Sequence, residues 1–185
     1  MTAGKAPLAG GPPHLVLVGL PGSGKSTVGP LLAAALGASF LDIDEEIERR
    51  EGLTVDQIFE QRGEDEFRAM ERAVTKELAA RPGMVVSPGG GWMADESNVR
   101  LLRPPARIIH LDVSVSTALS RLGPDIFRRP LLAGPAAESR LAALAAARMP
   151  LYSRADAVIN SESLTPQQVV SFGLRLASAW GWPIG

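Results

Sequence analysis

Short apolar runs alternate with longer stretches of helical character along most of this chain. The apolar runs have the length of strands, and they predict strands near residues 14–18, 39–42, 84–87, 106–111 and 156–159. Helices are expected between them, and two of the helix starts carry a capping box, Thr54 with Gln57 and Thr165 with Gln168. Such alternation is typical of βαβ units. The pattern therefore predicts an α/β fold, with a five-stranded parallel sheet flanked by helices on both faces.

A glycine-rich turn lies between the first predicted strand and the first predicted helix. Residues 19–26, Gly-Leu-Pro-Gly-Ser-Gly-Lys-Ser, follow the complete G-x-x-x-x-G-K-[ST] pattern of a phosphate-binding P-loop. Backbone N–H groups and the helix N-terminus attract phosphate there, Lys25 adds a positive charge, and the Ser26 hydroxyl suits Mg²⁺. A turn that only capped a helix would leave Lys25 and Ser26 unexplained. The predicted ATP-binding residues of this segment are Gly22, Ser23, Gly24, Lys25, Ser26 and Thr27.

The charge balance and the cysteine content limit the kinds of molecule that this protein is expected to bind. The 185 residues have the size of one domain, and 19 basic against 20 acidic residues leave a net charge of −1. That balance offers no general basic surface for nucleic acid and no polybasic membrane anchor. The chain has no cysteine, which excludes disulfides and cysteine zinc sites, and its two histidines are isolated. We therefore expect small-molecule substrates, no nucleic acid or membrane partner, and Mg²⁺ that arrives with the nucleotide.

The first residues differ in composition from the rest. Residues 1–13 are rich in Gly, Pro and Ala, and they lack the apolar core of a signal peptide. We expect them to form a disordered tail on a cytoplasmic protein. Residues 14–180 are then expected to form a single domain, with no apolar run of membrane-spanning length.

Two acids follow the second predicted strand, in Phe-Leu-Asp-Ile-Asp at residues 40–44. Side chains two residues apart on an extended segment point the same way, so Asp42 and Asp44 are expected to face one cleft beside the P-loop. Asp42 suits Mg²⁺, held through water, and Asp44 suits orienting or deprotonating a substrate hydroxyl. Alternatively, Asp44 with Glu45 and Glu46 only complements the dipole of the next helix, which is plausible for the two glutamates.

The segment with the two acids, Phe-x-Asp-x-Asp-x-x-Ile-Glu at 40–48, and four later segments fall in an order that identifies a family. The later segments are Gly-Glu-x-x-Phe-Arg-x-x-Glu at 63–71, Ser-Pro-Gly-Gly-Gly at 87–91, Arg-Arg-Pro-Leu-Leu at 128–132, and Arg-Met-Pro-Leu-Tyr at 148–152. Singly each is weak, but in register behind a P-loop they closely resemble the shikimate kinases, from His14 to about Val170. The resemblance implies a three-layer sandwich like that of P-loop nucleoside-monophosphate kinases, with a lid. It also implies ATP and shikimate as substrates.

The resemblance assigns an acceptor site. It implies that Arg68 and Arg148 bind the carboxylate of shikimate, that Asp44 binds the reacting hydroxyl, and that the backbone of Gly89, Gly90 and Gly91 lies against the substrate. Phe59 and Phe67 would then pack the pocket wall, and Glu71 could hold the Arg68 guanidinium one helical turn away. Each position also has a simpler interpretation, as a helix-surface ion pair, a core aromatic, a helix C-terminal charge or a mere turn.

A lid is expected over residues 123–134, which carry Gly and Pro at their edges and two arginines inside. Arg129 is the position that the resemblance assigns to the transferring phosphoryl group, with Arg128 as a substitute. A solvated basic loop is the alternative, and it fits Arg128 better. Arg121 is where the family packs an arginine against adenine.

The resulting hypothesis is transfer of the γ-phosphoryl of ATP to the 3-hydroxyl of shikimate, a step toward the aromatic amino acids. Lys25, Asp44 and Arg129 are the expected catalytic residues, in a protein expected to be monomeric. Two alternatives stay open, a related small-molecule kinase such as a gluconate kinase, and a kinase-like ligand sensor without turnover. Pro88 and Trp92 depart from the family pattern beside the glycine triplet, which could reshape the acceptor pocket.

Overall fold

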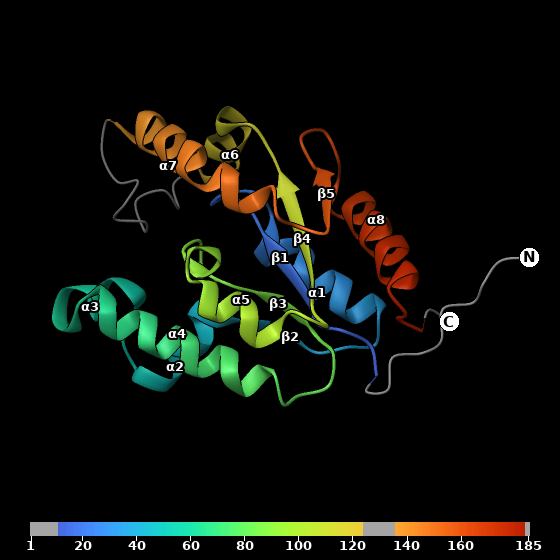
Figure 1. Ribbon diagram of the computed structural model, residues 1–185. Helices are drawn as coiled ribbons and strands as arrows, with labels where there is room; N and C mark the ends of the chain where they lie inside the picture. The colour runs from blue at the N-terminus through green and yellow to red at the C-terminus, as the bar shows by residue number, and fades with distance from the viewer. Residues whose placement is uncertain (1–10, 124–135, 184–185) are drawn as a thin grey trace, which may run out of the picture.

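The computed structural model describes residues 11–123 and 136–183. Within them lies one parallel sheet with strand order β2-β3-β1-β4-β5 (Figure 1). Every predicted strand is confirmed within a residue or so of its expected bounds. The strands are β1 (Leu15–Val18), β2 (Phe40–Asp42), β3 (Val85–Ser87), β4 (Arg107–Asp112) and β5 (Ala157–Asn160).

Helices cover both faces of this sheet, as the apolar strands require. Alternate residues of β1 show the division. Leu15 and Leu17 belong to one buried cluster with α1 (Lys25–Ala35) and α8 (Pro166–Ala179). Val16 and Val18 belong to a second cluster, which includes buried side chains of four α-helices between residues 64 and 152. These are α4 (Glu64–Leu78), α5 (Glu96–Leu102), α6 (Val115–Leu122) and α7 (Ala137–Tyr152). The predicted three-layer arrangement is confirmed.

Three consecutive helices extend the fold beyond the β2 edge of the sheet (Figure 1). Here α2 (Ile43–Glu51) and α3 (Val55–Arg62) both pack against α4. The Thr54–Gln57 capping box starts α3, and the Thr165–Gln168 box starts α8, as predicted. Each box satisfies two backbone donors that the helix itself leaves open. A short 3₁₀ turn, η1 (Trp92–Ala94), connects the glycine triplet to α5.

The N-terminal boundary differs from the prediction. Pro13, assigned to the tail, is buried, and its carbonyl accepts a hydrogen bond of 3.0 Å from Trp182 Nε1. Pro12 lies so close to Gly83 that an ideal Cβ on that glycine would be 2.2 Å from its carbonyl oxygen. The packed chain thus begins earlier than expected, because the indole supplies a donor that local composition could not reveal. Residues 1–10 of the predicted tail lie outside the described residues, and so do residues 124–135, which include Arg128 and Arg129.

Across the described part of the chain, no helix combines the length and the apolar character that crossing a membrane requires.

His14 is held in a neutral state just before β1. Met84 N donates to its Nδ1 at 3.3 Å, so Nε2 carries the proton and donates to the Leu78 carbonyl at 2.9 Å. Burial lowers the pKa of His14, and the hydrogen bond to Leu78 opposes that shift. If Nδ1 were protonated, its N–H would face the N–H of Met84, and neither buried donor would have an acceptor.

The contribution of His14 to the stability of the folded protein should therefore be lost as the pH falls. Because the pKa of His14 is lower in the folded state, its contribution is present above the unfolded pKa of about 6.5 and is lost as the pH falls below it. Urea unfolding near pH 7.5 and pH 5.5 should show a smaller pH dependence for His14→Gln than for the wild type. Burial also lowers the pKa of His110, so His110→Gln measures separately what the second histidine adds to the pH dependence. Equal pH dependence in the wild type and His14→Gln would contradict the assignment.

Candidate active site

The P-loop forms a tight turn between β1 and α1. Gly22 and Gly24 have φ angles of 81° and 98°, which favour glycine, and an ideal Cβ on Gly22 would lie 2.3 Å from the Ala118 carbonyl oxygen of α6. Gly24 precedes α1, and no side chain caps that helix start. Lys25 Nζ donates to the carbonyls of Gly19 and Leu20 at 2.9 and 3.0 Å. The loop thus presents a helix N-terminus and a lysine at one point, as phosphate binding requires.

Asp42 has a role that the strand pattern did not predict. Its Oδ1 accepts hydrogen bonds from Asp44 N at 3.0 Å and Glu45 N at 3.4 Å, so it caps α2. The extended segment ends at Asp42, and Asp44 already lies in the first turn of α2. The expectation of an extended Asp42-Ile43-Asp44 was therefore wrong. The two carboxylates still interact, but helix geometry brings them together.

Asp44 is half-buried, with charges of both signs around its carboxyl group. Its Oδ1 has no hydrogen-bond partner within the described parts of the chain. Burial, followed by the negative charges of Asp42 and Glu71, raises the pKa of Asp44 to about 7, against the opposing charges of Lys25 and Arg68. A carboxyl group with this pKa can exchange a proton near neutral pH. The alternative interpretation, in which Asp44 only complements the dipole of α2, does not account for this environment.

The glycine triplet after β3 brings three predicted acceptor residues together. An ideal Cβ on Gly89 would lie 2.5 Å from Asp44 Oδ1, one on Gly90 would lie 2.1 Å from Arg148 Nη1, and one on Gly91 would lie 2.4 Å from Arg68 Nη2. No side chain fits at these positions without displacing a charged group. The triplet is therefore a platform on which side chains from α2, α4 and α7 converge.

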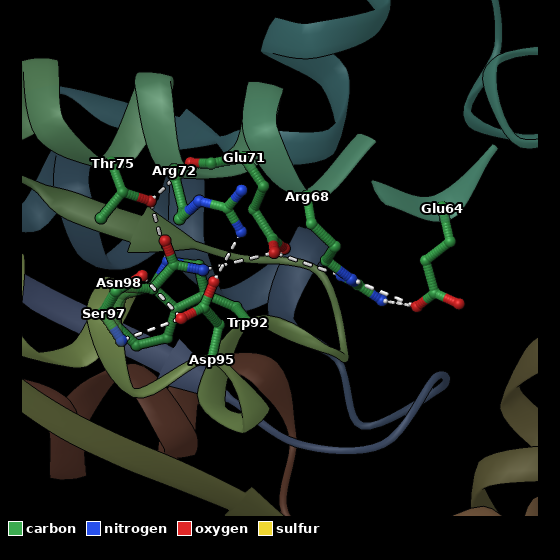
Figure 2. A network of polar contacts seen from close by, with 9 residues as sticks. All are labelled: Glu64, Arg68, Glu71, Arg72, Thr75, Trp92, Asp95, Ser97 and Asn98. Atoms are coloured by element: carbon green, nitrogen blue, oxygen red, sulfur yellow. Dashed lines mark hydrogen bonds and ion pairs between the residues drawn. The ribbon is translucent and has the colours of Figure 1, made fainter. Parts of the chain in front are cut away.

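Arg68 makes the helix ion pairs that its simpler interpretation required. Its Nη2 donates to Glu64 Oε1 at 2.9 Å, and its Nη1 donates to Glu71 Oε2 at 3.1 Å (Figure 2). The guanidinium nevertheless lies against Gly91 and keeps 24% of its side chain exposed, whereas Glu71 is fully buried. A buried carboxylate needs a partner. The ion pair therefore orients Arg68 and does not exclude a role in binding.

The aromatic residues near the platform belong largely to the core. Phe67 is 2% exposed, and Phe59 packs against it with ring centroids 4.9 Å apart. Trp92 is also buried, and its Nε1 donates to Thr75 Oγ1 of α4 at 2.9 Å (Figure 2). Pro88 is buried in the same region. Pro88 and Trp92, the two positions where a departure from the family pattern was noted, thus lie buried beside the glycine triplet.

Arg148 approaches the platform from α7. The last turn of that helix has no basic residue, so Arg148 does not serve as its C-terminal charge. Its Nη1 is buried without a hydrogen-bond partner among the described residues. The neighbouring Tyr152 stacks on His110, with ring centroids 4.6 Å apart. Burial raises the pKa of Tyr152, and the neighbouring Arg148 opposes this. The unpartnered Nη1 of Arg148 marks a place where a polar ligand would be stabilised.

Arg121 lies beside the segment that follows β5. Its Nη2 donates to the carbonyls of Ser161 and Glu162 at 2.6 and 3.2 Å. The Glu162 carboxylate also accepts from Ser114 N at 2.7 Å and binds Ser114 Oγ and Thr117 Oγ1 at the start of α6. Sequence reasoning missed this link, because only the tertiary structure places the end of β5 beside α6.

Only two protein ligands, Ser26 and Asp42, are predicted for Mg²⁺. Over the described residues, no group of three or more histidine or acidic side chains is placed to hold an ion by itself. Mg²⁺ in nucleotide sites commonly keeps several waters and takes one or two protein oxygens beside the phosphates. Ser26 in the P-loop and Asp42 next to Asp44 fit that limited donor set.

Sequence comparison agrees with this geometry. A sequence model described as shikimate kinase matches residues 21–175. The chain belongs to the shikimate kinase family. Its curated relatives include the shikimate kinase of Sulfurihydrogenibium sp., which is 42% identical over 157 residues that cover 85% of this chain and 93% of the relative. Another is the shikimate kinase of Thermobifida fusca, which is 43% identical over 158 residues that cover 84% of this chain and 90% of the relative.

Solved structures separate two kinds of kinase. The shikimate kinase from Acinetobacter baumannii in complex with shikimate has a TM-score of 0.84 at 37% identity, covering 90% of this chain and 93% of that one. A gluconokinase from Sinorhizobium meliloti has a TM-score of 0.58 at 20% identity, and the match covers 92% of this chain and 94% of the gluconokinase. The second likeness shows the fold alone. As a member of the shikimate kinase family, the chain is an ATP-dependent kinase.

The raised pKa of Asp44 predicts an effect on stability. Because the folded state holds the proton more tightly than the unfolded chain, stability should fall as the pH rises from about 4 to about 7. Asp44→Asn cannot ionise, so near pH 8 its Tm should exceed that of the wild type, by about 2–4 °C per kcal/mol of relieved charge burial. Thermal denaturation without nucleotide or Mg²⁺ measures this, with exposed Asp65→Asn as the control. A lower Tm for Asp44→Asn near pH 8 would refute the prediction.

Proposed function

We propose that this chain transfers the γ-phosphoryl group of ATP to the 3-hydroxyl of shikimate, giving shikimate 3-phosphate and ADP. The observation that carries the proposal is the convergence of Asp44, Arg68 and Arg148 on Gly89–Gly91. Shikimate is a small ring with one carboxylate and three hydroxyls. Such an acceptor needs cations at one end and an acid at the other, and the platform offers both.

In this proposal Arg68 and Arg148 bind the carboxylate of shikimate. The planar fork of a guanidinium matches a carboxylate with two hydrogen bonds. The pairing with Glu71 holds the Arg68 fork in place before substrate arrives, which lowers the entropy lost on binding. Arg148 Nη1, orphaned within the described residues, would gain a partner. Phe59 and Phe67 would support this end of the site.

Asp44 binds the reacting hydroxyl and accepts its proton. A pKa of about 7 lets the carboxylate remain ionised in a useful fraction and still take up a proton. The proton on the 3-hydroxyl oxygen passes to the Asp44 carboxylate as that oxygen forms its bond to the γ-phosphorus and the bond to the β-phosphate oxygen breaks. Catalysis rests mainly on positioning and charge stabilisation.

The P-loop binds the donor. Lys25 and the start of α1 lie against the phosphates, with Ser23, Ser26 and Thr27 beside them. When bound, Mg²⁺ neutralises charge on the phosphates, and Ser26 with Asp42 would hold it. Arg121 beside the adenine and Arg129 on the transferring group stay predictions, as do the cytoplasmic location and the monomeric state.

The two alternatives have less support. A gluconate kinase would share the fold, but its likeness at 20% identity says nothing of the acceptor, whereas the paired arginines suit a carboxylate. A sensor without turnover would be expected to lose catalytic residues. Lys25 is present in the P-loop, where it donates to the Gly19 carbonyl, and Asp44 is present with a raised pKa.

A coupled assay of ADP release tests the proposal. The wild type with ATP and Mg²⁺ should release ADP when shikimate is added, and should do so far less with gluconate or with no acceptor. Lys25→Ala and Asp44→Asn should lower kcat by about a hundredfold or more, since each removes a group at the transferring site. Circular dichroism checks that both variants fold. Equal ADP release with and without shikimate would refute the proposed acceptor.

The platform supplies a sharper test of the acceptor site. Gly90→Ala should push the Arg148 guanidinium aside, because the added carbon would lie 2.1 Å from Nη1. We expect KM for shikimate to rise by about tenfold, as after loss of one charged hydrogen bond. In a double-mutant cycle, Gly90→Ala should add little to Arg148→Ala, since both act through the same guanidinium. Full additivity would show that Gly90 acts elsewhere.

A further inference from the structure

Asn98 lies in α5, outside every motif of the sequence, and is fully buried. Its Nδ2 donates to Glu71 Oε2 at 3.3 Å (Figure 2). The same carboxylate oxygen accepts from Arg68 Nη1 at 3.1 Å. One oxygen of Glu71 is thus held between a buried amide on one side and the guanidinium of the acceptor site on the other.

A contribution to the stability of the fold does not explain why this amide and this carboxylate are buried together. Glu71 Oε1 and Asn98 Oδ1 are both buried without a hydrogen-bond partner in the described residues. Each such oxygen destabilises the folded protein, because it has given up hydrogen bonds to water without gaining a partner. A hydrophobic residue at position 98 would remove one of them. An amide that is buried at a cost and contacts a substrate-site ion pair points to a role in orienting that pair.

The other half of the network has a different character. Thr75 Oγ1 donates to the Glu71 carbonyl at 2.8 Å and accepts from Trp92 Nε1 at 2.9 Å (Figure 2). These bonds reach only the backbone of Glu71. Thr75 is as deeply buried as Asn98, so it offers a matched position that supports the helix without touching the carboxylate.

We propose that Asn98 is a positioning residue of the acceptor site. It holds the Glu71 carboxylate in one orientation, and Glu71 in turn holds the Arg68 fork toward Gly91, where the carboxylate of the acceptor binds. Without Asn98, Glu71 keeps its charge partner but loses its fixed orientation. This inference rests on the proposed function and assigns part of its specificity to α5.

Steady-state kinetics of Asn98→Leu provide the test. KM for shikimate should rise by about tenfold, which corresponds to one charged hydrogen bond. The kcat and the KM for ATP should stay within about threefold, because the P-loop and Asp44 are untouched. Thr75→Val should lower Tm through the lost Trp92 acceptor and leave KM for shikimate within about twofold. Asn98→Ser, which is smaller and polar, should raise KM for shikimate in the same way and covers the case that Asn98→Leu does not fold.

The outcomes separate the two proposals. If the wild type turns over shikimate and the Asn98 variants keep its KM, the positioning role is refuted and the proposed function stands. The positioning role is also refuted if Thr75→Val raises KM for shikimate as much as Asn98→Leu does, since the effect would then be general loosening. If the wild type does not act on shikimate, both proposals fail.

Discussion

The close approach of the Gly89–Gly91 backbone to three charged side chains is the constraint on which the site depends. Ideal Cβ atoms there would lie 2.1–2.5 Å from Asp44, Arg68 or Arg148, so the site exists only because that segment has no side chains. Strand β3 carries the triplet between β2 and β1, next to the P-loop strand. The acceptor platform and the phosphate-binding loop are therefore neighbours at the same edge of the sheet, as expected for parallel strands.

The electrostatics of the platform follow from this crowding. Glu71 is buried and Asp44 half-buried, and the pKa values of both are raised. The charge of Arg68 opposes both shifts, and that of Lys25 opposes the shift of Asp44. Several polar atoms remain without partners among the described residues, including Asp44 Oδ1, Arg148 Nη1 and Ser23 Oγ. Unsatisfied groups destabilise the free protein, and a polar substrate can relieve that cost only in the bound state. The same feature that lowers stability thus prepares the site for its ligands.

Local patterns explain why much of the fold could be predicted. A buried parallel strand must be a continuous apolar run, and a helix start must satisfy its open N–H groups, so strands and capping boxes are visible in a few consecutive residues. Long-range contacts explain the errors. Pro13 is buried because Trp182, at the other end of the chain, donates to it. Asp42 ends its strand as the cap of α2, which the alternation of strand side chains could not distinguish from continued extension.

The sequence by itself determined the P-loop, the layered α/β fold and the family, since each depends on residue types at short, ordered spacings. Only the tertiary structure decided how the acceptor residues work together. It brought Arg148 from α7 and Arg68 from α4 onto one glycine loop, and it placed Asn98 behind Glu71. The reason is physical: spacing along a chain specifies local hydrogen bonds, whereas the partners of a buried charge are chosen by packing between elements far apart in sequence.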